Sequence, residues 1–118
     1  MKVMIVDDSQ PVRRMIASFL DDLVDEFFEC EDGSKAPAAY REHRPDIVLM
    51  DIKMKRVDGF QATAEIKKAF PDARIVIVSQ WDTTDLRQLA NKSGAGAYVS
   101  KTNLQPLREF IESISKPS

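Results

Sequence analysis

The chain has 118 residues, which is the usual size of one compact domain. Hydrophobic residues make up 43% and charged residues 31%, a composition typical of a folded globular chain and not of a disordered one. The net charge is −2 and no block of lysine and arginine occurs, so the segment lacks the basic surface of a nucleic-acid-binding domain.

The cysteine content and the apolar runs indicate the compartment. The single cysteine, Cys30, cannot form an internal disulfide, and we interpret it as a small buried residue. The N-terminal apolar run is too short for a signal peptide, and no segment has the length needed to cross a bilayer. We therefore expect a cytoplasmic protein with one domain over residues 1–118, in which residues 115–118, "SKPS", are the start of a linker or a truncated chain end.

Short apolar segments and amphipathic segments alternate along the chain. The apolar segments are rich in β-branched residues and predict buried parallel strands, and the segments with apolar residues three and four apart predict helices. Pro11 suits the first turn of the first helix. In chain order the expected elements are strand 3–6, helix 12–23, strand 27–30, helix 34–43, strand 47–50, helix 59–69, strand 75–78, helix 83–93, strand 97–99 and helix 104–114.

This alternation predicts an α/β fold. Parallel strands that are apolar throughout must be covered on both faces, and the connecting helices provide the cover through right-handed crossovers. We therefore expect a three-layer sandwich in which a five-stranded parallel sheet lies between five helices.

Polar residues stand at the carboxyl ends of four of the expected strands. They are Asp7 and Asp8 after the first, Asp51 after the third, Ser79 after the fourth and Lys101 after the fifth. In an open parallel sheet, ligands bind at the carboxyl ends of the strands. Any one acid or hydroxyl could simply cap a helix, but capping does not explain two successive acids together with a lysine. The joint pattern indicates a functional site.

The chemistry of this set points to phosphoryl transfer. Three neighbouring carboxylates repel one another unless a cation intervenes, and oxygen ligands favour a hard ion such as Mg²⁺. A carboxylate beside a metal and a lysine can attack phosphorus, because both cations neutralise charge on the transferred group. Ser79 could then donate a hydrogen bond to a phosphoryl oxygen.

The motifs that carry these residues resemble a known family over essentially the whole chain. They are "IVDDS", "PDIVLMDIKM" with Asp58 and Gly59 following, "IVIVS" and "GAGAYVSK". Together they resemble the receiver domains of two-component response regulators, both the chemotaxis type and those attached to LuxR-type DNA-binding domains. The resemblance implies a flavodoxin-like strand order of 2-1-3-4-5.

The resemblance also implies a role for each acid. Asp51 is expected to be the phospho-acceptor, which takes a phosphoryl group from a histidine kinase or a phosphotransfer protein. Asp8, Asp51 and the backbone carbonyl of Lys53 are expected to bind Mg²⁺ or Mn²⁺ directly, and Asp7 through a water molecule.

The remaining roles concern the response to phosphorylation. Ser79 and Lys101 are expected to hold the phosphoryl oxygens, since a phosphoryl group adds about −1.5 to −2 charge and strong hydrogen-bond acceptors. Tyr98 matches the family's aromatic switch, although an ordinary half-buried strand aromatic explains it equally well. The expected output face comprises residues 83–93, 97–99 and 104–114 and would contact an effector domain or protein.

The sequence departs from the family pattern near the site. Thr102 follows Lys101 where the family usually has a proline, and Lys55 stands where a proline is frequent. Lys53 and Trp81 each lie two residues beyond a site residue, and the resemblance implies that side chains at these positions hinder or admit attacking water. We interpret them as modulators of dephosphorylation, with a solvent-facing role as the alternative.

Two other functions remain open at this point. An aspartate-nucleophile phosphatase also places an acid after a parallel strand, but its second acid lies two residues beyond the nucleophile, unlike the adjacent acids of "VDDSQ". A receiver that binds partners without phosphorylation is the other alternative.

We expect a regulatory domain and not an enzyme, apart from its own phosphorylation and dephosphorylation. We also expect no contact with a membrane and no direct contact with nucleic acid. The output, such as transcription regulation or a homodimer formed on phosphorylation, is left open.

Overall fold

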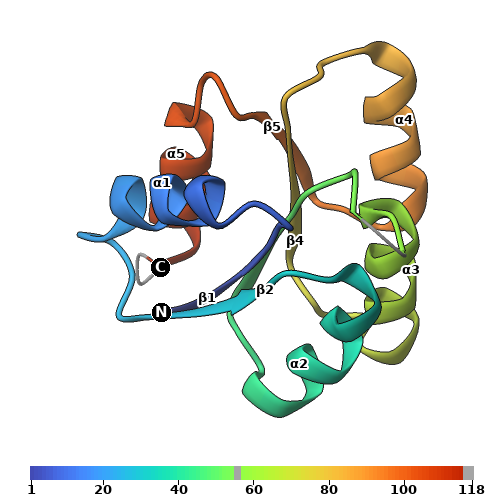
Figure 1. The fold of residues 1–118 in the computed structure, drawn as a ribbon, viewed down its shortest axis with the longest axis horizontal. Helices are drawn as coiled ribbons and strands as arrows, with labels where there is room; N and C mark the ends of the chain where they lie inside the picture. The colour runs from blue at the N-terminus through green and yellow to red at the C-terminus, as the bar shows by residue number, and fades with distance from the viewer. Residues whose placement is uncertain (55–56, 116–118) are drawn as a thin grey trace.

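The computed structural model describes residues 1–54 and 57–115. The departure at Lys55 and most of the expected linker at 115–118 therefore lie outside the described residues. Strands and helices alternate as expected (Figure 1). In chain order they are β1 (Lys2–Val6), α1 (Gln10–Leu20), β2 (Glu26–Cys30), a 3₁₀ helix (Gly33–Lys35), α2 (Ala36–His43), β3 (Ile47–Met50), α3 (Gly59–Ala69), β4 (Ile75–Ser79), α4 (Thr84–Ser93), β5 (Ala97–Ser100) and α5 (Gln105–Ser115).

The strands form one parallel sheet in the order β2-β1-β3-β4-β5. This confirms the flavodoxin-like order. The chain runs from β1 outward to β2 and then returns to place β3 on the other side of β1, so the strand order reverses between β1 and β3. The carboxyl ends of these two strands are the position at which open α/β sheets bind ligands.

Burial explains which strands were easy to predict. The described residues of β3 and β4 are buried throughout, as are all residues of β1 except Lys2. Both faces of these strands are covered, so their sequences are continuously apolar. The edge strands β2 and β5 are only partly buried, and their sequences carry a weaker pattern.

The helices cover the two faces of the sheet and complete the three layers (Figure 1). On one face, α1 and α5 pack through Ile16, Leu20, Leu107 and Ile111 against the strands. On the other face lie α2, α3 and α4, which contribute Tyr40, Ala62, Ile66 and Ala90. Alternate residues of each inner strand point into these two cores, because side chains along a strand alternate between faces.

Two helices differ from their expected ranges by more than one residue, the first helix and the second. The first helix ends at Leu20 and not at residue 23, because the chain turns there with the Leu23 N–H donating to the Leu20 carbonyl at 2.9 Å. The second predicted helix, 34–43, is divided into the 3₁₀ helix and α2. Pro37, which has no N–H to donate, fits the first turn of the shorter helix that begins at Ala36.

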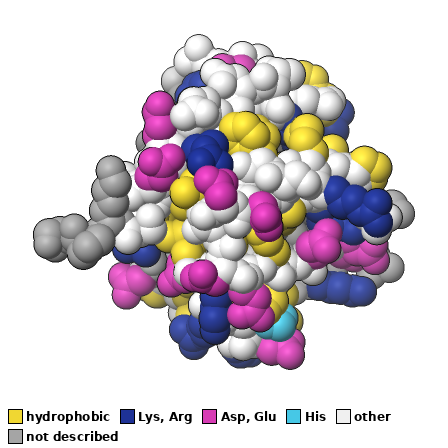
Figure 2. Space-filling view, turned by 90° about the vertical axis from the view of Figure 1, so that its left-hand side faces the viewer, with side chains coloured by type: hydrophobic (Ala, Val, Ile, Leu, Met, Phe, Trp, Pro, Cys, Tyr) yellow, Lys and Arg dark blue, Asp and Glu magenta, His cyan; other side chains and the backbone are white. Residues whose placement is uncertain are grey.

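The mixture of side chains on the surface agrees with the mixed composition of the sequence. On the face shown in Figure 2, acidic and basic side chains are interspersed with hydrophobic ones. Among the described residues, no helix is both long and apolar enough to cross a membrane. Cys30 is 8% exposed, which confirms its interpretation as a small buried residue.

Candidate functional site

The carboxyl ends of the strands bring the predicted side chains together. The Asp51 N–H donates to the Val6 carbonyl at 2.9 Å, and the Lys101 N–H donates to the Ser79 carbonyl at 2.8 Å, so neighbouring strands end at the same level. Between these ends lies a cavity of about 340 Å³. Its lining residues are Asp7, Asp8, Ser9, Val12, Asp51, Lys53, Gln80, Trp81 and Lys101.

Three carboxylates lie close enough to bind one cation. Each of Asp7, Asp8 and Asp51 offers an oxygen, and these oxygens lie within 4.8 Å of one another. Asp7 and Asp51 are only 2% and 7% exposed, while Asp8 is exposed. A cluster of carboxylate oxygens without nitrogen or sulfur ligands fits a hard divalent ion that keeps several waters.

Lys101 is the basic partner of the two buried acids. Its Nζ lies 3.0 Å from Asp7 Oδ2 and 3.0 Å from Asp51 Oδ1, and its side chain is 14% exposed. Burial acts to lower the pKa of Lys101, but the hydrogen bonds with Asp7 and Asp51 outweigh it and raise that pKa above its usual value. Lys101 is therefore charged at neutral pH.

The negative charge of Asp51 is only partly neutralised by this lysine. Burial and then the charge of Asp7 raise the pKa of Asp51, and the hydrogen bond from Lys101 offsets them only in part. One ammonium shared between two buried carboxylates leaves a net negative site. An additional cation or a positively polarised phosphorus would therefore be attracted to Asp51.

Ser79 and Tyr98 are linked through the loop after β4. Ser79 is fully buried, and its Oγ accepts a hydrogen bond from the Trp81 N–H at 3.0 Å. The Tyr98 hydroxyl donates to the Trp81 carbonyl at 2.6 Å. Tyr98 is half-buried, as a strand aromatic would be, but it also holds the loop that follows Ser79.

Lys53 and Trp81 contact each other at the rim of the cavity. The Lys53 Nζ lies 4.6 Å from the centre of the Trp81 ring, which is a cation–π distance. Trp81 is 38% exposed even so. The two side chains predicted to control access of water to Asp51 are thus neighbours, and both line the cavity.

The turn after Lys101 forms without a proline. The Ser100 Oγ accepts from the Thr102 N–H at 3.2 Å and lies 2.8 Å from the Thr102 hydroxyl. Ser100 also forms an isolated bridge with Asn103. Side-chain hydrogen bonds therefore shape this turn, at the position where the family resemblance led us to expect a proline.

Two further residues support the acids: Arg13, which no sequence motif singled out, and Gly59, which stands in the quoted motif without an assigned role. Arg13 donates from Nη1 to the Asp7 carbonyl at 2.7 Å and from Nε to Glu29 at 2.8 Å. Gly59 packs so tightly that a Cβ there would lie 1.9 Å from the Asp51 carbonyl oxygen. The available sequence signals were an arginine five residues after Asp8 and the "DG" after the third strand. Neither signal indicates which atoms the residue contacts.

Comparison with known proteins agrees with the fold. The family model of the response regulator receiver domain matches residues 3–112. This match covers most of the chain, and the chain belongs to that family.

Two curated relatives show the breadth of the family. The chemotaxis protein CheY of Halobacterium salinarum is 34% identical over 105 residues, which cover 89% of this chain and 88% of that protein. The response regulator protein VraR of Staphylococcus saprophyticus is 34% identical over 103 residues, which cover 86% of this chain but only 49% of VraR. The chain therefore spans nearly the whole of one relative and about half of the other.

A solved structure shows the same architecture. The two-component response regulator of the LuxR family from Aurantimonas sp. SI85-9A1 superposes with a TM-score of 0.86 at 32% identity, over 96% of this chain and 83% of that one. The flavodoxin-like receiver fold predicted from the sequence is thereby confirmed.

Proposed function

We propose that this receiver domain acts in the cytoplasm and takes a phosphoryl group onto Asp51 from a histidine kinase or phosphotransfer protein, in a Mg²⁺- or Mn²⁺-dependent reaction. The observation that carries the proposal is the position of Asp51. It is nearly buried between two further acids and Lys101, at the base of a cavity large enough to admit a phosphoryl group.

Each site residue has a part in the transfer. A carboxylate oxygen of Asp51 attacks phosphorus while the bond from phosphorus to the donor nitrogen breaks, and the leaving imidazole keeps the electron pair. Lys101 neutralises charge on the transferred oxygens, and it is already held beside Asp51. Asp8, Asp51 and the Lys53 carbonyl would hold the metal ion, with Asp7 acting through water, and the ion supplies further charge neutralisation.

The response to phosphorylation starts at Ser79. New phosphoryl oxygens attract the Ser79 hydroxyl and the Lys101 ammonium. Since Ser79 Oγ binds the Trp81 N–H and Tyr98 binds the Trp81 carbonyl, a movement of Ser79 would be transmitted through this loop. We propose that α4, β5 and α5 form the output face and change with it.

We propose further that Lys53 and Trp81 slow the loss of the phosphoryl group. Their cation–π contact covers part of the route by which water would approach Asp51. Hydrolysis requires water in line with the phosphorus–oxygen bond, so a covered route lengthens the lifetime of the phosphorylated state.

The output of this receiver depends on what it contacts. The length of VraR beyond the matched part allows an attached output domain, whereas the nearly full match to CheY allows action by protein contact alone. We propose an effector domain or protein at the output face, with dimerisation on phosphorylation as one form of response.

Intact-mass spectrometry after incubation with a small-molecule phosphodonor and Mg²⁺ tests the proposal. The wild-type chain should gain the mass of one phosphoryl group. The gain should be lost in Asp51→Ala and in the presence of a chelator. A folded wild-type chain that gains nothing would instead favour a receiver that binds partners without phosphorylation.

A further inference from the structure

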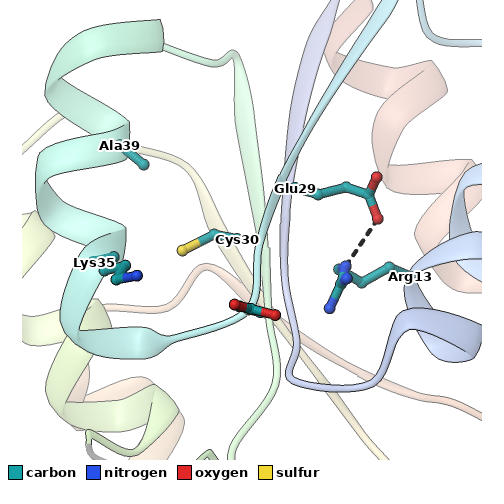
Figure 3. Close-up of a pocket in the computed structure, with 6 residues that line it drawn as sticks. Arg13, Glu29, Cys30, Lys35 and Ala39 are labelled. Carbon is teal, nitrogen blue, oxygen red and sulfur yellow. Dashed lines mark hydrogen bonds and ion pairs between the residues drawn. The ribbon is translucent and has the colours of Figure 1, made fainter.

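Arg13, in α1, is a largely buried basic residue to which the proposed function assigns no role. Its side chain is 11% exposed, with Nε donating to Glu29 Oε1 at 2.8 Å and Nη1 donating to the Asp7 carbonyl at 2.7 Å. Figure 3 shows the guanidinium reaching the Glu29 carboxylate beside a cavity of about 360 Å³. One side chain thus joins α1 to β2 and to the end of β1.

The carbonyl that Arg13 binds belongs to the peptide between Asp7 and Asp8. The Asp7 carboxylate is held independently, because its Oδ1 accepts from the Ser9 N–H at 2.9 Å and its Oδ2 lies 3.0 Å from Lys101 Nζ. The Asp8 carboxylate is exposed, so its direction depends mainly on the backbone that carries it. Fixing the plane of this peptide fixes the N–Cα bond of Asp8, so that rotation about this bond and within the side chain is all that remains to direct the carboxylate.

The chemistry of arginine suits this contact. Asp7 is 2% exposed, and a buried carbonyl needs a hydrogen-bond donor. A guanidinium presents several N–H groups in a rigid fork and can bind a carboxylate and a carbonyl at once, in fixed directions. A lysine in this position would carry the same charge on a single flexible nitrogen.

We propose that Arg13 is a positioning residue for the metal site. It holds the Asp7–Asp8 peptide so that the Asp8 carboxylate faces Asp51, and it thereby sets the affinity of the acids for a divalent cation. This inference rests on the proposed function, because it concerns the same metal site.

Titration of the wild-type chain with Mg²⁺ tests the inference without any activity measurement. Trp81 is the single tryptophan and lines the cavity of the acids, so its fluorescence reports occupancy, and calorimetry gives the same constant independently. Residues that orient metal ligands typically change affinity by about 10- to 100-fold. For Arg13→Gln we expect a Kd about tenfold higher than for the wild type.

The matched control is Arg14→Gln. Arg14 is the next residue of the same helix and is exposed, so this variant loses the same charge without the contact to Asp7. Its Kd should stay within about twofold of the wild type, as expected for an exposed charge that moderate salt screens. Arg13→Lys keeps the charge and should fall between the two, and it serves as the test variant if Arg13→Gln does not fold. At saturating Mg²⁺, the rate of phosphorylation of the Arg13 variants should recover toward that of the wild type.

The outcomes separate the two proposals. A wild-type chain that binds Mg²⁺, with Kd values for Arg13→Gln and Arg13→Lys equal to that of Arg14→Gln, would overturn the role of Arg13 and leave the proposed function standing. A folded wild-type chain that shows neither Mg²⁺ binding nor a phosphoryl adduct would overturn the proposed function and this inference with it.

Discussion

Gly59 begins α3 directly beneath the proposed acceptor, and Gly59→Ala is the substitution with the clearest expected result. An added Cβ would lie 1.9 Å from the Asp51 carbonyl oxygen, 2.8 Å from its carbonyl carbon and 3.1 Å from the Ile52 Cα. All three atoms belong to the backbone. No side chain can turn away to relieve the contact, so α3 and the end of β3 must separate.

The size of the effect follows from these distances. Real Cβ atoms essentially never approach a neighbour closer than 3.0 Å, so the backbone must move by about 1 Å. The Gly59 N–H also donates to the Ile52 carbonyl at 2.8 Å, and the same movement would strain this bond. Overpacking of this kind costs about 3 kcal/mol of unfolding free energy at the upper end of its usual range. A misplacement of about 1 Å at a reacting group lowers the rate by about 100-fold.

Urea unfolding and the rate of phosphorylation by a small-molecule phosphodonor measure the two effects. Gly96→Ala is the matched control, because a Cβ at Gly96 would meet only the Ile75 carbonyl oxygen, at 3.9 Å. This control should unfold within about 0.5 kcal/mol of the wild type and react at the same rate. If Gly59→Ala matches Gly96→Ala in both measurements, the tight contact of Gly59 with Asp51 has neither of the effects assigned to it. A loss of stability with an unchanged rate would show that this contact does not position Asp51.

Two further predictions concern the charge and the cover of the site. Because the pKa of Asp51 is raised in the folded state, the folded chain holds the Asp51 proton more tightly than the unfolded chain does. The stability of the wild type should therefore fall as the pH rises from the ordinary aspartate pKa of 3.8 through the pKa that Asp51 has in the folded state. Without Mg²⁺, Asp51→Asn should therefore be more stable than the wild type at neutral pH by about 1 kcal/mol, an advantage that shrinks as the pH falls through this range. Urea unfolding at several pH values with a chelator checks this, and a variant less stable than the wild type at neutral pH would contradict it. Trp81→Ala should shorten the lifetime of the phosphorylated chain several-fold, since it uncovers the cavity and removes the partner of Lys53. Following the decay of the phosphoryl adduct by mass spectrometry, with Leu89→Ala as an exposed apolar control, measures this change, and equal lifetimes would rule out the role of the cover.

The inner strands were predictable because they are buried on both faces, so each of them is a continuous run of apolar residues in the sequence. Val3–Val6 and Ile47–Met50 are almost fully buried, and each is stopped by an acid where the strand leaves the core. The same fact located Asp7 and Asp51, since the ends of parallel strands meet at one edge of the sheet. The helix ends were less exact, because the position of Pro37 and a turn after Leu20 decide them locally.

Contacts between distant side chains were not predictable in this way. Arg13 and Glu29 lie 16 residues apart and meet only because β2 pairs with β1 beside the start of α1. The same holds for the cation–π contact of Lys53 with Trp81. The family resemblance placed both residues beside the acceptor, but only the structure shows that they contact each other. A sequence pattern records the face of an element that is buried, but it does not record which side chains of two elements meet.

The decisive experiment for the role of Asp51 is to identify the residue that carries the phosphoryl group. After incubation with a phosphodonor and Mg²⁺, reduction with borohydride converts a phosphorylated aspartate to homoserine, and tandem mass spectrometry locates the change. We expect homoserine at position 51 and at no other aspartate. Homoserine at Asp7 or Asp8, or an unchanged Asp51 in a chain that has gained a phosphoryl group, would contradict this expectation.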